Sequence, residues 1–163
     1  MKLPADRSPG PSGLIAGFAP GTRIRCGNKL CRVEMLRAGD LVSTMANGER
    51  PITSVERHDH AGSQLTPALL PIRIERDTFG GGFPRRDLTL SPRHRLLVRG
   101  ARLALMSGQA GGLVPAVTLL GTQGVRRLDR SEVSYIQLLF DAPEIIFANG
   151  WGTESLCAAD AMP

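Results

Sequence analysis

Residues 17–24 read GFAPGTRI and residues 31–44 read CRVEMLRAGDLVST, and these two stretches tell most about how the chain folds. Short apolar runs alternate in them with turn residues, and the runs stop at Gly27-Asn28 and at Gly39-Asp40. Apolar runs of this length, bounded by glycine, asparagine and aspartate, are typical of β-strands joined by tight turns. We therefore expect the fold to begin with closely spaced strands.

The same pattern continues along the chain. Residues 71–75 (PIRIE) alternate apolar and polar side chains, which is the signature of a half-buried strand. The expected strands are 22–25, 32–36, 41–44, 52–56, 71–75, 88–90, 95–98, 113–117, 133–140 and 144–148, and only 101–109 and 116–120 are candidates for a helical turn. Nineteen glycines and 12 prolines agree with frequent turns. The pattern predicts an all-β sandwich or barrel-like domain.

The length of 163 residues fits one ordinary domain. We expect a flexible leader at 1–16, a folded domain at 17–157 and a short tail at 158–163. No apolar run reaches the roughly 18–20 residues of a membrane-spanning helix. Proline, aspartate and glycine stand where a secretory signal would be apolar, so we expect a cytoplasmic protein or one exported without an N-terminal signal peptide.

The positive net charge is weak evidence for a nucleic-acid partner. The net charge is +5 and the pI is near 9.9, but only two of the 20 basic residues are lysine, and aromatic residues make up 4%. Nucleic-acid sites usually concentrate basic residues on one element beside stacking aromatic rings. We expect a solvated basic surface and no specific nucleic-acid site; weak binding to anionic surfaces stays open as a lesser alternative.

Two further stretches complete a resemblance. Residues 87–98 read DLTLSPRHRLLV and residues 135–155 read YIQLLFDAPEIIFANGWGTES. With the opening stretch, and in the same order, they resemble the opening, central and closing motifs of the Hint domain, the module shared by inteins and Hedgehog autoprocessing domains. GGFPRRD at Gly81–Asp87 and Thr153-Glu154-Ser155 look most like a bacterial Hint subfamily. The resemblance runs from Gly17 to Leu156 and implies a compact, pseudo-symmetric, horseshoe-like all-β fold.

The resemblance also implies a chemistry. In Hint autoprocessing the first residue, a Cys or Ser, attacks the preceding carbonyl and converts an amide into a labile ester. A central Thr and His contact that amide, and the His donates a proton to the departing nitrogen. By the motif match, Ser91 stands at the Thr position, His94 at the His position, and Gly17 at the position of the nucleophile.

The closing block departs from the family pattern as well. Glu154-Ser155 occupies the place of the terminal His-Asn of inteins, so cyclisation of an asparagine has no donor there. Gln137 and Pro143 stand where the bacterial subfamily would carry histidines.

Glycine has no side chain, so we predict that Hint self-cleavage at Ala16–Gly17 is lost. The chain would then act as a binding or structural module, with a protein as the candidate partner and no cofactor. The alternative is an active autoproteolytic domain, in which water or a partner thiol attacks while Ser91 and His94 polarise the amide.

Other reactive residues have simpler interpretations. Cys26 and Cys31, and the pair His58 and His60, lack the spacing of a zinc finger, so we expect no metal site. The two cysteines are interpreted as small buried apolar residues. Attack by the Cys26 thiol on a nearby carbonyl is the minor alternative. Asn149-Gly150 is interpreted as a turn, with slow succinimide formation as its alternative.

Overall fold

The computed structural model describes residues 16–98 and 112–157. The expected tail at 158–163, all but the last residue of the expected leader, and the expected helical turn at 101–109 lie outside these ranges. Within them the chain forms strands and short 3-10 helices. The strands are β1 Arg23–Cys26, β2 Lys29–Arg32, β3 Leu41–Ser43, β4 Glu49–Pro51, β5 Ser54–Ala61, β6 Ile72–Ile74, β7 Leu88–Leu90, β8 Arg95–Val98, β9 Gly112–Pro115, β10 Val125–Arg127, β11 Glu132–Phe140, β12 Ile145–Ala148, β13 Trp151–Glu154 and β14 Leu156–Cys157. The predicted all-β class is confirmed.

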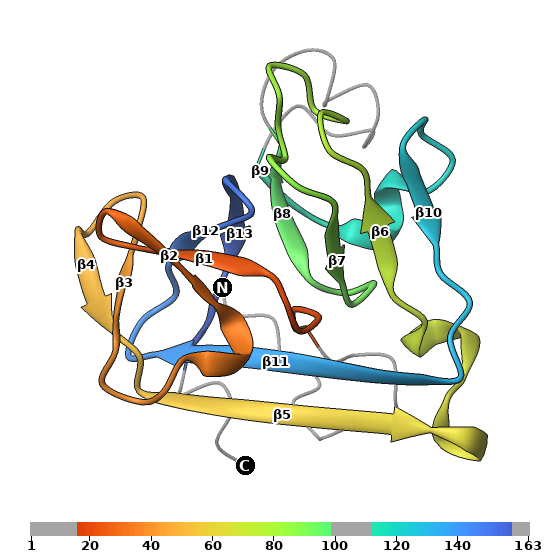
Figure 1. Cartoon of the computed structure of the whole chain (residues 1–163), viewed down its shortest axis with the longest axis horizontal. Helices are drawn as coiled ribbons and strands as arrows, with labels where there is room; N and C mark the ends of the chain where they lie inside the picture. The colour runs from red at the N-terminus through yellow and green to blue at the C-terminus, as the bar shows by residue number, and fades with distance from the viewer. Residues whose placement is uncertain (1–15, 99–111, 158–163) are drawn as a thin grey trace, which may run out of the picture.

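The strands form four open sheets. A six-stranded sheet has the order β2-β1-β12-β13-β8-β9, and three-stranded sheets have the orders β10-β6-β7 and β14-β11-β5; β3 and β4 form a hairpin. The antiparallel pair of β5 and β11 runs as a long ribbon along one side of the molecule, and the shorter strands stand on it in two groups (Figure 1). This arrangement is the open, horseshoe-like shape that was expected.

The expected strand at 32–36 is wrong. Lys29–Arg32 forms β2 instead, and Val33–Met35 is a 3-10 turn. Two contacts hold this turn: the Val33 backbone N–H donates to the Thr22 carbonyl at 2.8 Å, and the Glu34 carboxylate accepts from the Gly21 N–H at 2.8 Å. The turn buries the Val33 side chain, so this residue is apolar because it is buried and not because it lies in a strand.

The segment that precedes β1 holds two sheets together. Phe18 exchanges two backbone hydrogen bonds with Ile136 of β11, at 2.9 and 2.8 Å, and forms a bridge with Leu90 of β7. Its neighbour Ala19 donates to the Thr89 carbonyl at 3.1 Å. The Phe18 side chain is 1% exposed and belongs to the main hydrophobic cluster. Residues 17–19 therefore act as a short connecting strand between β7 and β11.

Among the described residues, no helix has the length and apolar character that crossing a membrane requires.

Candidate functional site

The structure brings Gly17, Ser91 and His94 together in the interior. The Gly17 backbone N–H donates to the Ser91 hydroxyl oxygen at 3.0 Å, and the Ser91 N–H donates to the Gly17 carbonyl at 3.0 Å. The His94 N–H then closes a turn on the Ser91 carbonyl at 3.1 Å. The turn between β7 and β8 therefore holds the amide that joins Ala16 to Gly17, as the central Hint motif would require.

The His94 ring is buried and neutral. Its side chain is 3% exposed, and neither ring nitrogen has a hydrogen-bond partner of normal geometry. Burial lowers the pKa of His94 to about 4, and backbone groups of Glu154 and Gly17 oppose this only in part. The Phe18 ring packs against it with 4.3 Å between centroids. At neutral pH the imidazole is therefore unprotonated and beside the Gly17 backbone.

The position that the motif match assigns to the nucleophile, Gly17, has no room for a side chain. A Cβ atom on Gly17 would lie 2.8 Å from the Tyr135 Cβ and 3.3 Å from the Ile136 backbone nitrogen. Both atoms belong to β11, whose backbone is paired with β5 on its other side. The Tyr135 side chain is fully buried, and its hydroxyl donates to the Leu69 carbonyl. Relief of the contact would therefore require a shift of β11 itself.

In the closing block, the side chains of Ser155 and Glu154 form hydrogen bonds and an ion pair within the fold. The Ser155 hydroxyl donates to the Glu144 carbonyl at 3.1 Å and accepts from the Glu144 N–H at 3.0 Å. The Glu154 carboxylate pairs with the Arg95 guanidinium, and the Arg95 Nε donates at 2.7 Å. These contacts join β13 to β8 and to the chain before β12. Neither side chain is available to replace a cyclising asparagine.

Asn149 is a structural residue of the β12–β13 turn. It adopts a positive φ of 48° and is followed by Gly150 with φ 85°. Its side-chain oxygen accepts from the Arg23 N–H at 2.8 Å, and its amide nitrogen donates to the Asp87 carbonyl at 3.0 Å. The turn interpretation of Asn149-Gly150 is confirmed. The two hydrogen bonds restrain the side chain that succinimide formation would need to move.

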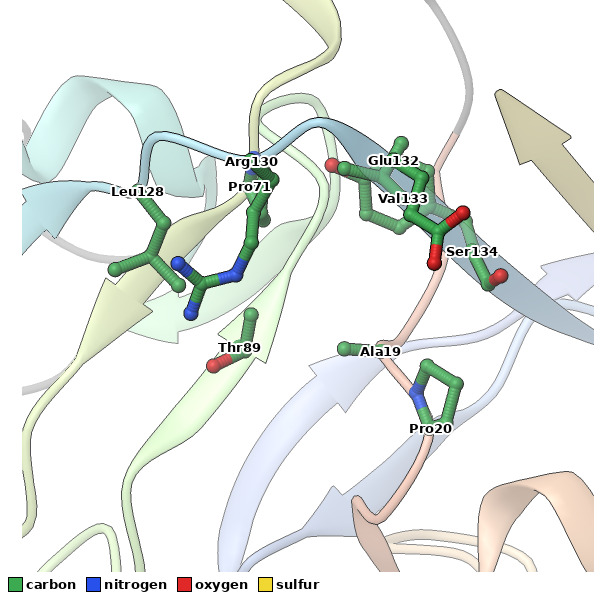
Figure 2. A pocket seen from close by; sticks show the side chains of 10 residues that line it. Ala19, Pro20, Pro71, Thr89, Leu128, Arg130, Glu132, Val133 and Ser134 are labelled. Atoms are coloured by element: carbon green, nitrogen blue, oxygen red, sulfur yellow. The ribbon is translucent and has the colours of Figure 1, made fainter. Parts of the chain in front are cut away.

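A pocket opens where the connecting segment leaves β11. It has a volume of about 280 Å³, and its walls include Ala19, Pro20, Thr89 and Glu132 (Figure 2). None of Gly17, Ser91 and His94 lines it. A water molecule or small thiol in this pocket would not touch the Ala16–Gly17 amide.

The other predicted candidates lie outside this cluster. Cys26 is buried beside Cys31, and burial together with that neighbour raises the pKa of the Cys26 thiol to about 12, so it is protonated at neutral pH. His58 lies on β5, and its ring Nε2 is 3.0 Å from the Gln137 side-chain oxygen on β11. Pro143 is exposed in the loop before β12. Over 16–98 and 112–157, no three His, Cys, Asp or Glu side chains converge in a way that could hold a metal.

Two residues that shape the site were missed from the sequence. Tyr135 closes the space at Gly17, and Phe18 covers the His94 ring. The alternation of β11 implied that Tyr135 faces inward, but no sequence signal showed that it faces Gly17. Phe18 stood beside the motif position and could have been assigned to the core.

Comparisons with known proteins agree with this arrangement. The sequence model of a family described as the Hint domain matches residues 16–160. A bacterial intein-like domain from Clostridium thermocellum is similar at 15% identity, with a TM-score of 0.52 over 85% of this chain and 97% of that one. The TvoVMA intein is 11% identical, with a TM-score of 0.55 over 85% and 96% of the two chains.

The N145AA variant of the MchDnaB-1 intein is also similar, at 10% identity and a TM-score of 0.54 over 86% of this chain and 99% of that one. No curated protein matches the chain. At these identities the solved structures establish the fold, and the predicted Hint fold is confirmed.

Proposed function

The chain belongs to the Hint-domain family, and from this premise we propose that it is a Hint domain that has lost self-cleavage and serves as a binding or structural module. The proposal rests on the position of the first residue. Gly17 offers no nucleophile, and its surroundings on β11 leave no space for one. Without a side-chain nucleophile the acyl shift that begins autoprocessing has no attacking atom.

The retained residues alone do not supply this step. The Ser91 hydroxyl oxygen accepts from the Gly17 N–H, and the buried His94 is neutral. General acid–base help typically accelerates a reaction about 10²–10⁴-fold. It cannot replace the nucleophile, which must be supplied by another group. In this proposal the two residues hold the turn between β7 and β8 against the connecting segment.

One observation favours a second candidate, an autoproteolytic domain with an external nucleophile. The Ser91 hydroxyl contacts the N–H of the Ala16–Gly17 amide, and the His94 ring lies beside the Gly17 backbone. Gly17, Ser91 and His94 are buried, but Ala16, whose carbonyl carbon would be attacked, is half-buried, so cleavage itself must be measured.

The deciding experiment is the intact mass of the purified full chain, incubated from about pH 6 to about pH 8 with and without a small thiol. We expect the mass to stay near 17.5 kDa in every sample. Variants His94→Gln and Ser91→Ala are incubated in parallel, and circular dichroism confirms that each is folded. A product that begins at Gly17, formed by the native chain and lost in either folded variant, overturns the proposal in favour of the second candidate.

A further inference from the structure

A groove with an entirely cationic set of charges lies on the outer face of β1 and β12. It has a volume of about 430 Å³. Arg23 and Arg25 face outward from β1, alternating with the buried Ile24 and Cys26. Lys29 adds a charge from β2, and Arg85 and Arg86, which precede β7, also line the groove. No carboxylate lines the groove. The volume is within the range of about 300–1,000 Å³ that is usual for ligand pockets.

These charges are not neutralised within the described part of the chain. The ion pairs recorded there join Arg57 to Asp59, His58 to Glu56, Arg73 to Asp87 and Arg95 to Glu154, and none includes a cation of the groove. Five like charges around one concave surface repel one another and attract an anion. Formation of the groove therefore costs free energy that an anionic ligand would offset.

Hydrogen bonds hold together the backbone segments that carry the lining residues of the groove. The Arg85 backbone N–H donates to the Asn149 carbonyl at 2.8 Å, and the Asn149 side chain bonds both Arg23 and Asp87. Asn149 thus ties the Arg85-Arg86 segment to β1. A preformed site loses little conformational freedom on binding, which favours affinity.

The floor of the groove is apolar and narrows the choice of ligand. Leu30, Phe83 and Phe147 line it, and Leu30 is 57% exposed. The Arg85 guanidinium covers one face of the Phe83 ring, 4.0 Å from its centroid, which leaves less of this ring for base stacking. Single-stranded nucleic acids rely on such stacking platforms. With one face of Phe83 occupied, the carboxylates of a peptide suit these cations better than a strand that depends on base stacking.

We propose that this groove binds an extended acidic segment of a partner protein, one in which Asp or Glu side chains at alternate positions face Arg23 and Arg25. Arg23 and Arg25 are two residues apart on a strand, so their spacing of about 6–7 Å equals that of alternate side chains in an extended peptide. Guanidinium groups bind carboxylates in bidentate geometry. The side chains between the carboxylates point to the opposite face of an extended peptide. The inference rests on the proposed binding role and gives it a site and a ligand class.

The test is a fluorescence-polarisation titration of the full chain with a short labelled peptide in which Glu and Leu alternate. Peptides with Lys in place of Glu, and with Ser in place of Leu, separate the contributions of charge and apolar contact. Single-stranded oligothymidine and inorganic phosphate are titrated as competitors. We expect the Glu-Leu peptide to bind, its affinity to fall with salt, and the Lys-Leu peptide not to bind.

Matched triple variants locate the site. Arg23→Gln, Arg25→Gln and Arg86→Gln remove groove charges and spare Arg85, which stacks on Phe83. The control variant carries Arg37→Gln, Arg50→Gln and Arg126→Gln, three exposed arginines that do not line the groove. Its net charge equals that of the groove variant. We expect at least tenfold weaker binding in the groove variant and less than twofold in the control.

Equal losses in the two variants, or no binding of the Glu-Leu peptide to the native chain, overturn the inference. Tighter binding of oligothymidine than of the peptide also overturns it and makes a nucleic acid the ligand. Cleavage at Ala16–Gly17 in the mass experiment would refute the proposed loss of autoprocessing and leave this titration unaffected. The two proposals can therefore fail separately.

Discussion

The absence of a side chain at Gly17 is the basis of the proposed loss of self-cleavage. In the connecting segment, Gly17 presents its hydrogen to the Tyr135 Cβ, and any other residue would place a carbon 2.8 Å from it. Real Cβ contacts are essentially never that short. The absence of a side chain is thus part of how residues 17–19 pack between β7 and β11.

Gly17→Cys is expected to destabilise the fold and to leave the chain uncleaved. The added Cβ must displace β11, and such overpacking costs about 1–3 kcal/mol of unfolding free energy. Urea denaturation measures the stability, and intact mass with a thiol measures cleavage. Ala38→Cys, at an exposed position, is the control for an added thiol and should change neither readout. A Gly17→Cys protein as stable as the native chain would contradict the packing argument.

Burial of His94 predicts a loss of stability in mild acid. An unfolded histidine has a pKa near 6.5, and burial lowers the pKa of His94 to about 4. Below pH 6.5 the unfolded state therefore binds a proton that the folded state does not, so stability falls as the pH drops and levels off below about 4. From about pH 7 to about pH 5, we expect a loss of about 2 kcal/mol.

Urea denaturation at these two pH values measures the loss, and His94→Gln, which cannot titrate, should abolish most of it. The carboxylates do not mask the effect. The Arg76 N–H and the Arg73 guanidinium lower the pKa of Asp87, so its contribution is lost only at more acid pH. An equal pH dependence in the His94→Gln protein would show that other groups cause the loss.

The sequence placed the three residues of the site better than it described their surroundings. Motif spacing identified Gly17, Ser91 and His94, and they are neighbours in the fold. Which side chain faces Gly17 depends on the register between residues 17–19 and β11. That register is set by contacts over more than a hundred positions, which local sequence patterns do not record.

At the scale of the elements, strands with strong local patterns were predictable and strands defined by their partners were not. β6, β7, β8 and β11 follow alternating or continuous apolar runs and were expected nearly at their observed bounds. β4, Glu49–Pro51, is fully exposed and exists because it pairs with β3. β13 contains a glycine and a tryptophan and exists because it pairs with β12 and β8.

The β12–β13 turn is expected to depend on Asn149. Asn149→Ala would leave the Arg23 N–H and the Asp87 carbonyl, both partly buried, without a side-chain partner and place alanine at a positive φ. We expect a loss of about 2–4 kcal/mol in urea denaturation. Asn149→Asp keeps the acceptor for Arg23 and loses the donor, so its loss should be intermediate. If both variants matched the native stability, the structural role of Asn149 would be wrong.

For the whole molecule, the connecting segment is the element that joins the separate sheets. Phe18 contacts β7 through its bridge to Leu90 and β11 through its hydrogen bonds to Ile136. Its ring also covers His94. We therefore expect the Phe18 side chain to make a large contribution to the stability of the fold, although the connecting segment is short.

Phe18→Ala is expected to cost about 3–5 kcal/mol in urea denaturation, as for other buried aromatic residues. The variant should also admit water to His94, so that the pKa of its ring, followed by NMR titration, rises towards 6.5. Met35→Ala, at a side chain that is 68% exposed, should change stability by less than about 0.5 kcal/mol. A Phe18→Ala protein with unchanged stability and His94 pKa would contradict this role.

The close contact between Gly17 and Tyr135 also limits which substitutions at position 17 can be tolerated during evolution. A single substitution that restores a thiol at position 17 enters a space already filled by β11, and it lowers stability before it can yield any reaction. A reactive side chain at position 17 would need a compensating change in β11 at the same time. Under the proposed loss of self-cleavage, recovery of the reaction requires two changes, whereas its loss requires one.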